Sequence, residues 1–381
     1  MRVHPAAIRA LVVTLGIACA GGAWSQAQRA VGPGEVVVHT KFGGFILGYD
    51  IDQNGTEGIL SEAVTNADGT HDVAVETFDQ RTGEIIKVLR RQRDSNNDYV
   101  TLGIYGDHVA LTEFEHVSDI FVDKRRYLLS DPIDSNRITG KWTPPFGKAT
   151  DIISGGAPSQ GFDTALFFGF KNTADDFHTY LFTSNVGANT FGPVIPVEGT
   201  DVFDWNNSPA VTYDYGRNRA VLGGSHGCFL CPTAIGQVDL ATGVLTFHVG
   251  LGTGFVNGIA VDPNTHIACT TTEDDFSVEF YNLVKDTGKR VVLPGATSQL
   301  YSGGAVAVDP IHKLFLVGQE FSSTAASGSS IHVYDEKGNL VESLDGFDLP
   351  ASPAYMALNP SQRSGFVIVT PDLSSLQSFT Y

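Results

Sequence analysis

Short apolar runs recur along this chain at a near-constant spacing, and each run closes on an acidic or amide residue. Four of them align, with closing residues 48, 47 and 50 positions apart: Val211–Asp214, Ile259–Asp262, Val306–Asp309 and Met356–Asn359. A fifth copy, Ile120–Asp123, lies 91 residues before Asp214. Each copy continues through a turn into a second apolar run. Runs this short, bounded by turn residues, predict β-strands, and no capped helical pattern follows residue 25.

A repeat of about 40 to 50 residues made of short strands is typical of a β-propeller. The last repeat supplies three strands before the chain stops at Tyr381, whereas a propeller blade needs four. The missing strand is available at the other end, in Glu35–His39. We therefore predict an all-β, single-domain propeller of seven four-stranded blades, closed by pairing of the N- and C-terminal strands. The six other blades are expected near residues 41–93, 94–146, 147–199, 200–250, 251–297 and 298–349.

The N-terminus has the pattern of an export signal. Arg2 and Arg9 form a basic region, and the apolar segment from Ala10 to Ala20 follows it. Ala23-Trp-Ser25 then supplies the small residues that signal peptidase cleavage needs. We predict a signal peptide at residues 1–25 and a propeller domain at residues 26–381. The protein is then secreted or periplasmic. No later stretch is apolar and long enough to insert into a membrane.

The charge of the chain restricts its partners. The formal net charge is −18, and removal of residues 1–25 takes away two arginines and no acid, which gives −20. A protein this acidic is not expected to bind nucleic acid through a basic surface or to dock on anionic lipid. It suits a divalent cation, a basic partner or a neutral glycan.

The strongest local motif is Asp50-Ile-Asp52-Gln-Asn54-Gly-Thr56. Oxygen-bearing side chains at alternate positions, followed by a glycine and a free carbonyl, are typical of a calcium loop. With Phe42-Gly-Gly44 before it, the segment resembles the FG-GAP calcium loops of integrin-type propellers, although Gly58 stands where that family has Asp. This predicts calcium ligands at Asp50, Asp52, Asn54 and Thr56. The alternative is an ordinary polar turn between strands Phe45–Ile51 and Gly58–Ala63.

A second resemblance lies in Asn257-Gly-Ile-Ala-Val-Asp262. This segment is similar to the inner-strand entry of the broad NHL, YVTN and SMP-30-like propeller group. In SMP-30-like lactonases, an Asn-Gly at this point supplies a metal ligand in the central channel. The resemblance implies that Asn257 is a channel ligand. However, Pro209, Gly304 and Ala354 occupy the matching places in other repeats, and their side chains cannot coordinate a metal.

Three cysteines remain after cleavage of the signal peptide: Cys228, Cys231 and Cys269. In an oxidising compartment this count favours one disulfide, Cys228–Cys231, and one buried free thiol, with Cys228–Cys269 as the alternative pairing. The thiols together with His226 could instead form a soft-metal site.

One cluster of residues is a candidate for acid–base chemistry. Glu113 and Glu115 share one face of a predicted strand that also carries His116, and neighbouring carboxyls can exchange protons with a substrate. A solvated strand face is the alternative.

Two functions remain open. The first is a binding protein with calcium as a structural ion, which recognises a small molecule, a glycan or a protein at the propeller rim. The second is a metal-dependent lactonase or esterase with its site in the central channel.

Overall fold

The computed structural model describes residues 37–381 except Asn54, Asn96 and the stretches that follow. These are 106–107, 118–119, 130–137, 143–151, 158–163, 174–175, 186–187, 189, 194, 198–209, 226–230, 255, 273–276, 296–300, 322–328, 348–355 and 370–372. Between residues 94 and 180 the description covers the backbone and the Ile104 side chain. The predicted signal peptide lies outside the described residues.

The described strands form seven antiparallel sheets. The first three are β2 (Phe45–Ile51), β3 (Glu57–Thr65), β4 (His71–Asp79), β5 (Ile85–Ser95); β6 (Asn97–Tyr105), β7 (His108–Val117), β8 (Ile120–Leu129), β9 (Ile138–Trp142); and β10 (Ile152–Ala157), β11 (Thr164–Thr173), β12 (Asp176–Asn185), β13 (Thr190–Phe191), β14 (Ile195–Val197). The next three are β15 (Ala210–Asp214), β16 (Arg219–Ser225), β17 (Pro232–Asp239), β18 (Leu245–Thr253); β19 (Val256–Asp262), β20 (Ile267–Thr272), β21 (Ser277–Asn282), β22 (Thr287–Val292); and β23 (Tyr301–Asp309), β24 (Leu314–Phe321), β25 (Ser329–Asp335), β26 (Leu340–Phe347). The seventh is β27 (Met356–Asn359), β28 (Ser364–Val369), β29 (Ser375–Thr380) and β1 (Val37–His39).

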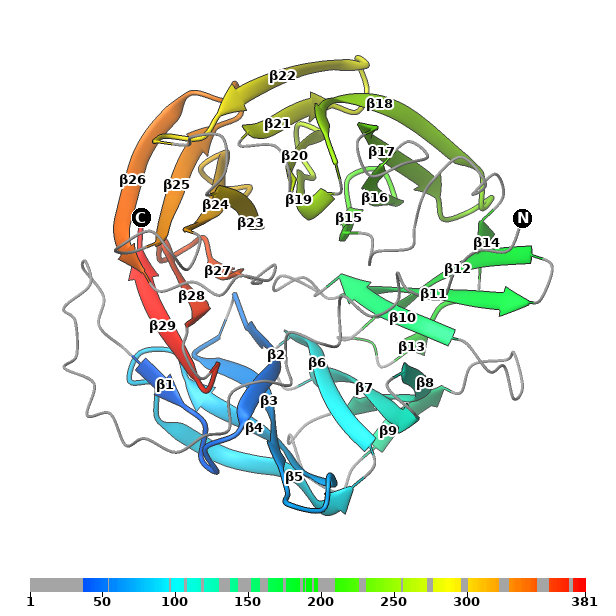
Figure 1. Cartoon of the computed structure of the whole chain (residues 1–381), viewed down its shortest axis with the longest axis vertical. Helices are drawn as coiled ribbons and strands as arrows, with labels where there is room; N and C mark the ends of the chain where they lie inside the picture. Colours follow the sequence, from blue (N-terminus) through cyan, green and yellow to red (C-terminus); the bar gives the residue numbers. More distant parts are fainter. Residues whose placement is uncertain are drawn as a thin grey trace.

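The sheets are arranged as blades around a central axis, and the first strand of each lies nearest the centre (Figure 1). Each later strand of a blade lies farther from the axis than the one before it, so β5, β9, β18, β22 and β26 lie at the periphery. Six sheets have four strands, and the third has five because β13 and β14 both pair with β12. Four of the six predicted blade ranges enclose one of these sheets, and in the other two the last strand, β5 or β18, runs two or three residues past the predicted end.

The closing blade joins the two ends of the chain. Strand β1 pairs antiparallel with β29, and Val38 lies opposite Leu376. Both side chains are fully buried in an apolar cluster shared with the first and sixth blades. The predicted pairing of N- and C-terminal strands is thus confirmed, and it removes two unpaired sheet edges.

One copy of the predicted repeat is wrong. Ile120–Asp123 falls in β8, the third strand of its blade, whereas the inner strand of that blade is β6. The pattern misled because apolar runs closed by an acid also end third strands, as at Asp79 and Asp239. The sequence analysis missed the copy of the repeat on the inner strand of the first blade, where Asp52 directly follows β2. In the described part of the chain, no helix has the length and hydropathy needed to cross a bilayer.

The closing contact gives a stability prediction. Leu376→Ala leaves a cavity beneath β1, so we expect the free energy of unfolding to fall by about 2–5 kcal/mol. Leu340→Ala, at a side chain that is 48% exposed on β26, is the matched control and should change it by less than about 0.5 kcal/mol. Urea unfolding of both variants measures the difference. Equal effects would contradict a buried closure.

Candidate functional site

The first-blade motif forms a tight hairpin turn between β2 and β3. Asp50 and Asp52 are buried, and one Asp50 carboxylate oxygen accepts the Ile104 backbone N–H at 3.4 Å. The Asp52 carboxylate lies so close to Gly55 that a Cβ there would sit 2.3 Å from Asp52 Oδ2. A side chain at this position would therefore displace the Asp52 carboxylate. Asn54 lies outside the described residues.

Gln80 forms hydrogen bonds with three backbone carbonyls of this turn. Its side-chain Nε2 donates to the carbonyls of Asp52 and Glu57 at 2.7 and 2.8 Å, and its backbone N–H donates to the Thr56 carbonyl at 2.8 Å. A calcium ion at the Thr56 carbonyl would use the second lone pair of that oxygen. Calcium binding at Asp50, Asp52, Asn54 and Thr56 therefore stays a prediction.

Asp52 belongs to a set of buried polar residues that close the inner strands. We call this set the strand-end ring: Asp52, Asp214, Asp262, Asp309 and Asn359, each at most 4% exposed. The side chains of Asp262, Asp309 and Asn359 accept hydrogen bonds from the following turn, as Asp309 Oδ1 does from the backbone N–H groups of Ile311 and His312 at 2.9 Å. An acid in this role stabilises a turn and needs no ligand.

Members of the strand-end ring also contact the next blade. His266 Nδ1 of the fifth blade lies 3.1 Å from both carboxylate oxygens of Asp214 in the fourth. The Tyr381 hydroxyl donates to Asp309 Oδ2 at 3.0 Å. Asn359 Nδ2 donates to Gln80 Oε1 at 3.2 Å, which links the seventh blade to the first. Burial raises the pKa of Asp214, and His266 opposes that shift.

Asn257 lies at an irregularity at the start of β19. The pairing with β20 shifts between Val256 and Gly258, so Asn257 is the extra residue of a β-bulge. A Cβ at Gly258 would sit 2.5 Å from the Gly304 carbonyl oxygen of the next blade, which explains the glycine. Among the residues that the structure describes, no group of three or more His, Cys, Asp and Glu is placed to hold a metal ion. A channel metal at Asn257 stays a prediction.

The predicted acid–base cluster lies on β7, the second strand of the second blade. Glu113 is in register with Arg125 of β8, Glu115 with Val122 and His116 with Phe121. The inner strand of this blade is β6, so the cluster is one strand removed from the centre. Its side chains lie outside the described residues.

Cys269 carries a free thiol that is fully buried on β20. The alternative pairing of Cys228 with Cys269 is therefore wrong, and burial raises the pKa of this thiol well above its ordinary value. Cys228 and His226 lie outside the described residues. The disulfide between Cys228 and Cys231 stays a prediction.

Sequence reasoning missed a pair of buried carboxyl groups in the first blade. Glu62 on β3 and Glu76 on β4 are 1% and 0% exposed. Glu62 accepts the backbone N–H groups of Phe42 and Gly44 at 3.2 and 3.1 Å, and Glu76 Oε2 accepts that of Lys41 at 3.4 Å. Within the described residues, Glu76 Oε1 has no hydrogen-bond partner. The pair thus holds the segment that joins β1 to the first blade.

The surroundings of Glu76 favour its protonated form. Burial is the main cause and the nearby Glu62 charge the second, and together they raise the pKa of Glu76 to about 7. Lys41 and Arg91 oppose the shift. Arg91 also lies 3.5 Å over the Phe42 ring and 3.8 Å from Asp72.

A sequence signal for such residues exists. Glu76, Glu279 and His332 each stand three positions before the residue that opens an outer turn, at Asp79, Asn282 and Asp335. All three are buried on the third strand of a blade. Glu279 accepts the Leu251 backbone N–H of the preceding blade at 2.8 Å, as Glu76 does that of Lys41. The two glutamates thus bind the preceding outer strand or the segment after it, whereas His332 contacts Gln319 and Ser343 of its own blade.

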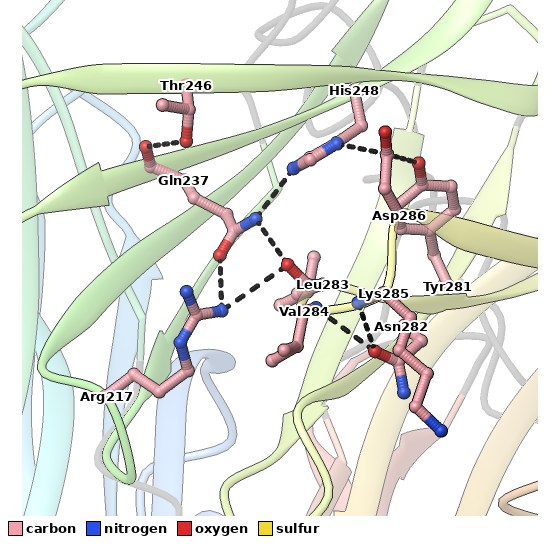
Figure 2. A network of polar contacts seen from close by, with 10 residues as sticks. All are labelled: Arg217, Gln237, Thr246, His248, Tyr281, Asn282, Leu283, Val284, Lys285 and Asp286. Atoms are coloured by element: carbon pink, nitrogen blue, oxygen red, sulfur yellow. Dashed lines mark hydrogen bonds and ion pairs between the residues drawn. The ribbon is translucent and has the colours of Figure 1, made fainter.

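A polar network joins the fourth and fifth blades next to β18 (Figure 2). Gln237 accepts a hydrogen bond from Arg217 Nη1 at 2.8 Å and donates to the Leu283 carbonyl at 3.1 Å. Its Nε2 lies 2.8 Å from His248 Nε2, and His248 Nδ1 lies 2.5 Å from Asp286 Oδ1.

The network fixes the tautomer of His248. Because the Gln237 amide nitrogen is a donor, His248 Nε2 accepts and its Nδ1–H donates to Asp286. Hydrogen bonds from Tyr281 and then His248 lower the pKa of Asp286. Both ring nitrogens are occupied, so His248 joins the two blades and orients β18.

The other face of β18 is apolar and open. Phe247 and Val249 are 39% and 51% exposed. β18 is the last strand of its sheet. Half-exposed apolar side chains side by side on an edge strand are a feature of surfaces that bind other proteins.

Comparison with known proteins shows which solved structures have a similar fold. No family model and no curated protein matches this sequence. Solved structures do: the U3-55K structure has a TM-score of 0.60 at 13% identity, covering 91% of this chain and 98% of that one. The Dos1 propeller gives 0.57 at 10%, with 91% and 94% covered. The Cps50 (Swd1) propeller domain of Myceliophteria thermophila gives 0.55 at 10%, with 92% and 100% covered.

This chain is a β-propeller. The structural similarity establishes the architecture. Sequence identities this low leave the function of the propeller open.

The buried carboxyl pair gives a pH prediction. The unfolded-state pKa of Glu76 is near 4.5 and its folded value is about 7, so its ionisation destabilises the folded protein as pH rises between these values. Glu76→Gln removes this loss, and its stability relative to the parent should rise from pH 5 to pH 8. Exposed Glu84→Gln is the control. A stability difference that is flat across this range in thermal melts would contradict the assignment.

Proposed function

We propose that this propeller is an exported recognition protein that binds another protein at its outer edge. The observation that supports this is the exposed apolar face of β18, formed by Phe247 and Val249. Protein-binding surfaces are enriched in aromatic and large apolar side chains and depleted of charge. The strand also lies on a rigid base, since the Gln237–His248–Asp286 network fixes its other face to the fifth blade.

Export is part of the proposal. It rests on the signal pattern of residues 1–25 and on the spacing of Cys228 and Cys231, which suits a disulfide in an oxidising compartment. The mature chain would begin at Gln26.

Calcium and the channel hydrolase are held as separate proposals. A calcium titration by calorimetry on the chelated mature chain addresses both. Loss of the binding heat in Asp52→Asn would support the first-blade turn. Loss in Asn257→Ala would support the channel and the lactonase or esterase alternative.

Site-specific photo-crosslinking tests recognition at β18. A photoreactive phenylalanine analogue replaces Val249 in the protein exported by its own host, and we expect a discrete crosslinked species. The same replacement at Ile86 is the control, because Ile86 is 52% exposed on the peripheral strand β5 and so matches Val249 in accessibility. Crosslinks of equal yield at both positions, or at neither, would sink the proposal.

A further inference from the structure

The ring closes through a short stretch of chain between the seventh and first blades. We call residues 40–44 the seam segment, because they join β1, the outer strand of the seventh blade, to β2, the inner strand of the first. The backbone N–H groups of Phe42 and Gly44 in this segment donate to Glu62 carboxylate oxygens at 3.2 and 3.1 Å. Side chains of the first blade thus hold the backbone of the seam segment.

Glu76 holds a third N–H of the seam segment, and it does so with one oxygen. Its Oε2 accepts the Lys41 N–H at 3.4 Å, whereas Oε1 has no hydrogen-bond partner in the described part of the chain. Glu279, at the matching position of the fifth blade, uses both oxygens. Its Oε1 accepts the Leu251 N–H at 2.8 Å, and its Oε2 accepts the Thr233 hydroxyl at 3.1 Å. The same contact therefore exists in a fully bonded and an incompletely bonded form.

The face of β4 that carries Glu76 is turned toward the seventh blade. Phe78, two positions farther along β4, packs edge-on against the Phe366 ring of β28 with centroids 5.4 Å apart. Val75, on the opposite face, shares an apolar cluster with Ile104 of the second blade. Side chains alternate along a strand, so Glu76 lies at the seam and not between the first and second blades.

Charged groups of both signs act on the Glu76 carboxyl. Burial is the largest cause of the rise of its pKa to about 7. The charged neighbours come from three elements: Glu62 on β3, which raises the pKa, and Lys41 of the seam segment and Arg91 on β5, which lower it. Asp72 on β4 lies 3.8 Å from Arg91, and His39 on β1 is exposed. Strands β27, β28 and β29 carry no Asp, Glu, Lys, Arg or His.

We infer that Glu76 is a pH-operated latch on the closure of the ring: the seam segment stays closed while Glu76 is protonated and opens when Glu76 loses its proton to solvent. Ionisation puts a second negative charge beside Glu62 and leaves a buried, charged oxygen without a hydrogen-bond donor. A carboxylate in that state is costly, and the cost disappears when water reaches it. The latch goes beyond recognition at β18 and does not depend on it.

The opening is local because few contacts hold the seam. Strand β1 has three residues and pairs with β29, whereas β3 and β4 each have nine and pair along their length. Opening of a weakly held segment costs less free energy than unfolding of a blade. Val38 favours closure, since its side chain is fully buried in the apolar cluster of the seam. The segment therefore returns to the closed state when the pH falls.

Amide hydrogen exchange on the full mature chain measures the latch directly. The closed state binds the Glu76 proton more tightly than the open state, whose carboxyl has its ordinary pKa near 4.5, so closure is complete at low pH and is lost as the pH rises through about 7. From pH 5 to pH 8, we expect the protection factors of the Lys41, Phe42 and Gly44 amides to fall by at least about tenfold after correction for intrinsic exchange. The Leu251 amide, bound to the fully bonded Glu279, is the internal control and should keep its protection.

Glu76→Gln retains an acceptor for the Lys41 N–H and cannot ionise, so protection of the seam segment should become independent of pH in this variant. Exposed Glu84→Gln should behave like the parent. Protection that is flat from pH 5 to pH 8 in the parent, or that still falls in Glu76→Gln, would overturn the latch. An equal fall at Leu251 would show that the whole ring opens and would overturn it as well. None of these outcomes bears on recognition at β18.

Discussion

The architecture depends on buried polar residues at the ends of the inner strands. Apolar contacts between blades are abundant but not directional, so they do not by themselves fix how one sheet sits against the next. The strand-end ring adds directional hydrogen bonds across blade boundaries. Asp214 bonds His266, Asp309 bonds Tyr381, and Asn359 bonds Gln80. A carboxylate buried in this way is costly unless its hydrogen bonds are made. At these three boundaries one blade therefore supplies the partner that a buried residue of its neighbour needs.

This dependence explains which sequence predictions were confirmed. The repeat, the blade count and the closing strand followed from period and pattern, because each blade must close with the same residue types. Identifying the function of single residues was harder. Asp52 has the sequence pattern of a calcium ligand and is also the first-blade member of the strand-end ring, and the Thr56 carbonyl beside it accepts the Gln80 N–H. The same residue types serve both roles, and only the three-dimensional partners distinguish them.

Two features could not be predicted from the sequence, for physical reasons: the buried carboxyl pair and the exposed surface of β18. Glu62 and Glu76 lie fourteen positions apart and meet only because β3 and β4 pair. The exposure of Phe247 and Val249 depends on how neighbouring blades cover β18, whereas the sequence of that strand reads as an ordinary buried or half-buried one.

The most direct measurement of this account is a double-mutant cycle across the sixth and seventh blades. Asp309→Ala, Tyr381→Phe and the double variant are compared by urea unfolding. The account predicts a coupling free energy of at least about 0.5 kcal/mol, because the Tyr381 hydroxyl donates to Asp309 at 3.0 Å. Tyr213→Phe, whose hydroxyl contacts Asn218 in its own blade, should combine additively with Asp309→Ala. Additive effects for Asp309 and Tyr381 as well would contradict the claim that strand-end residues join the blades.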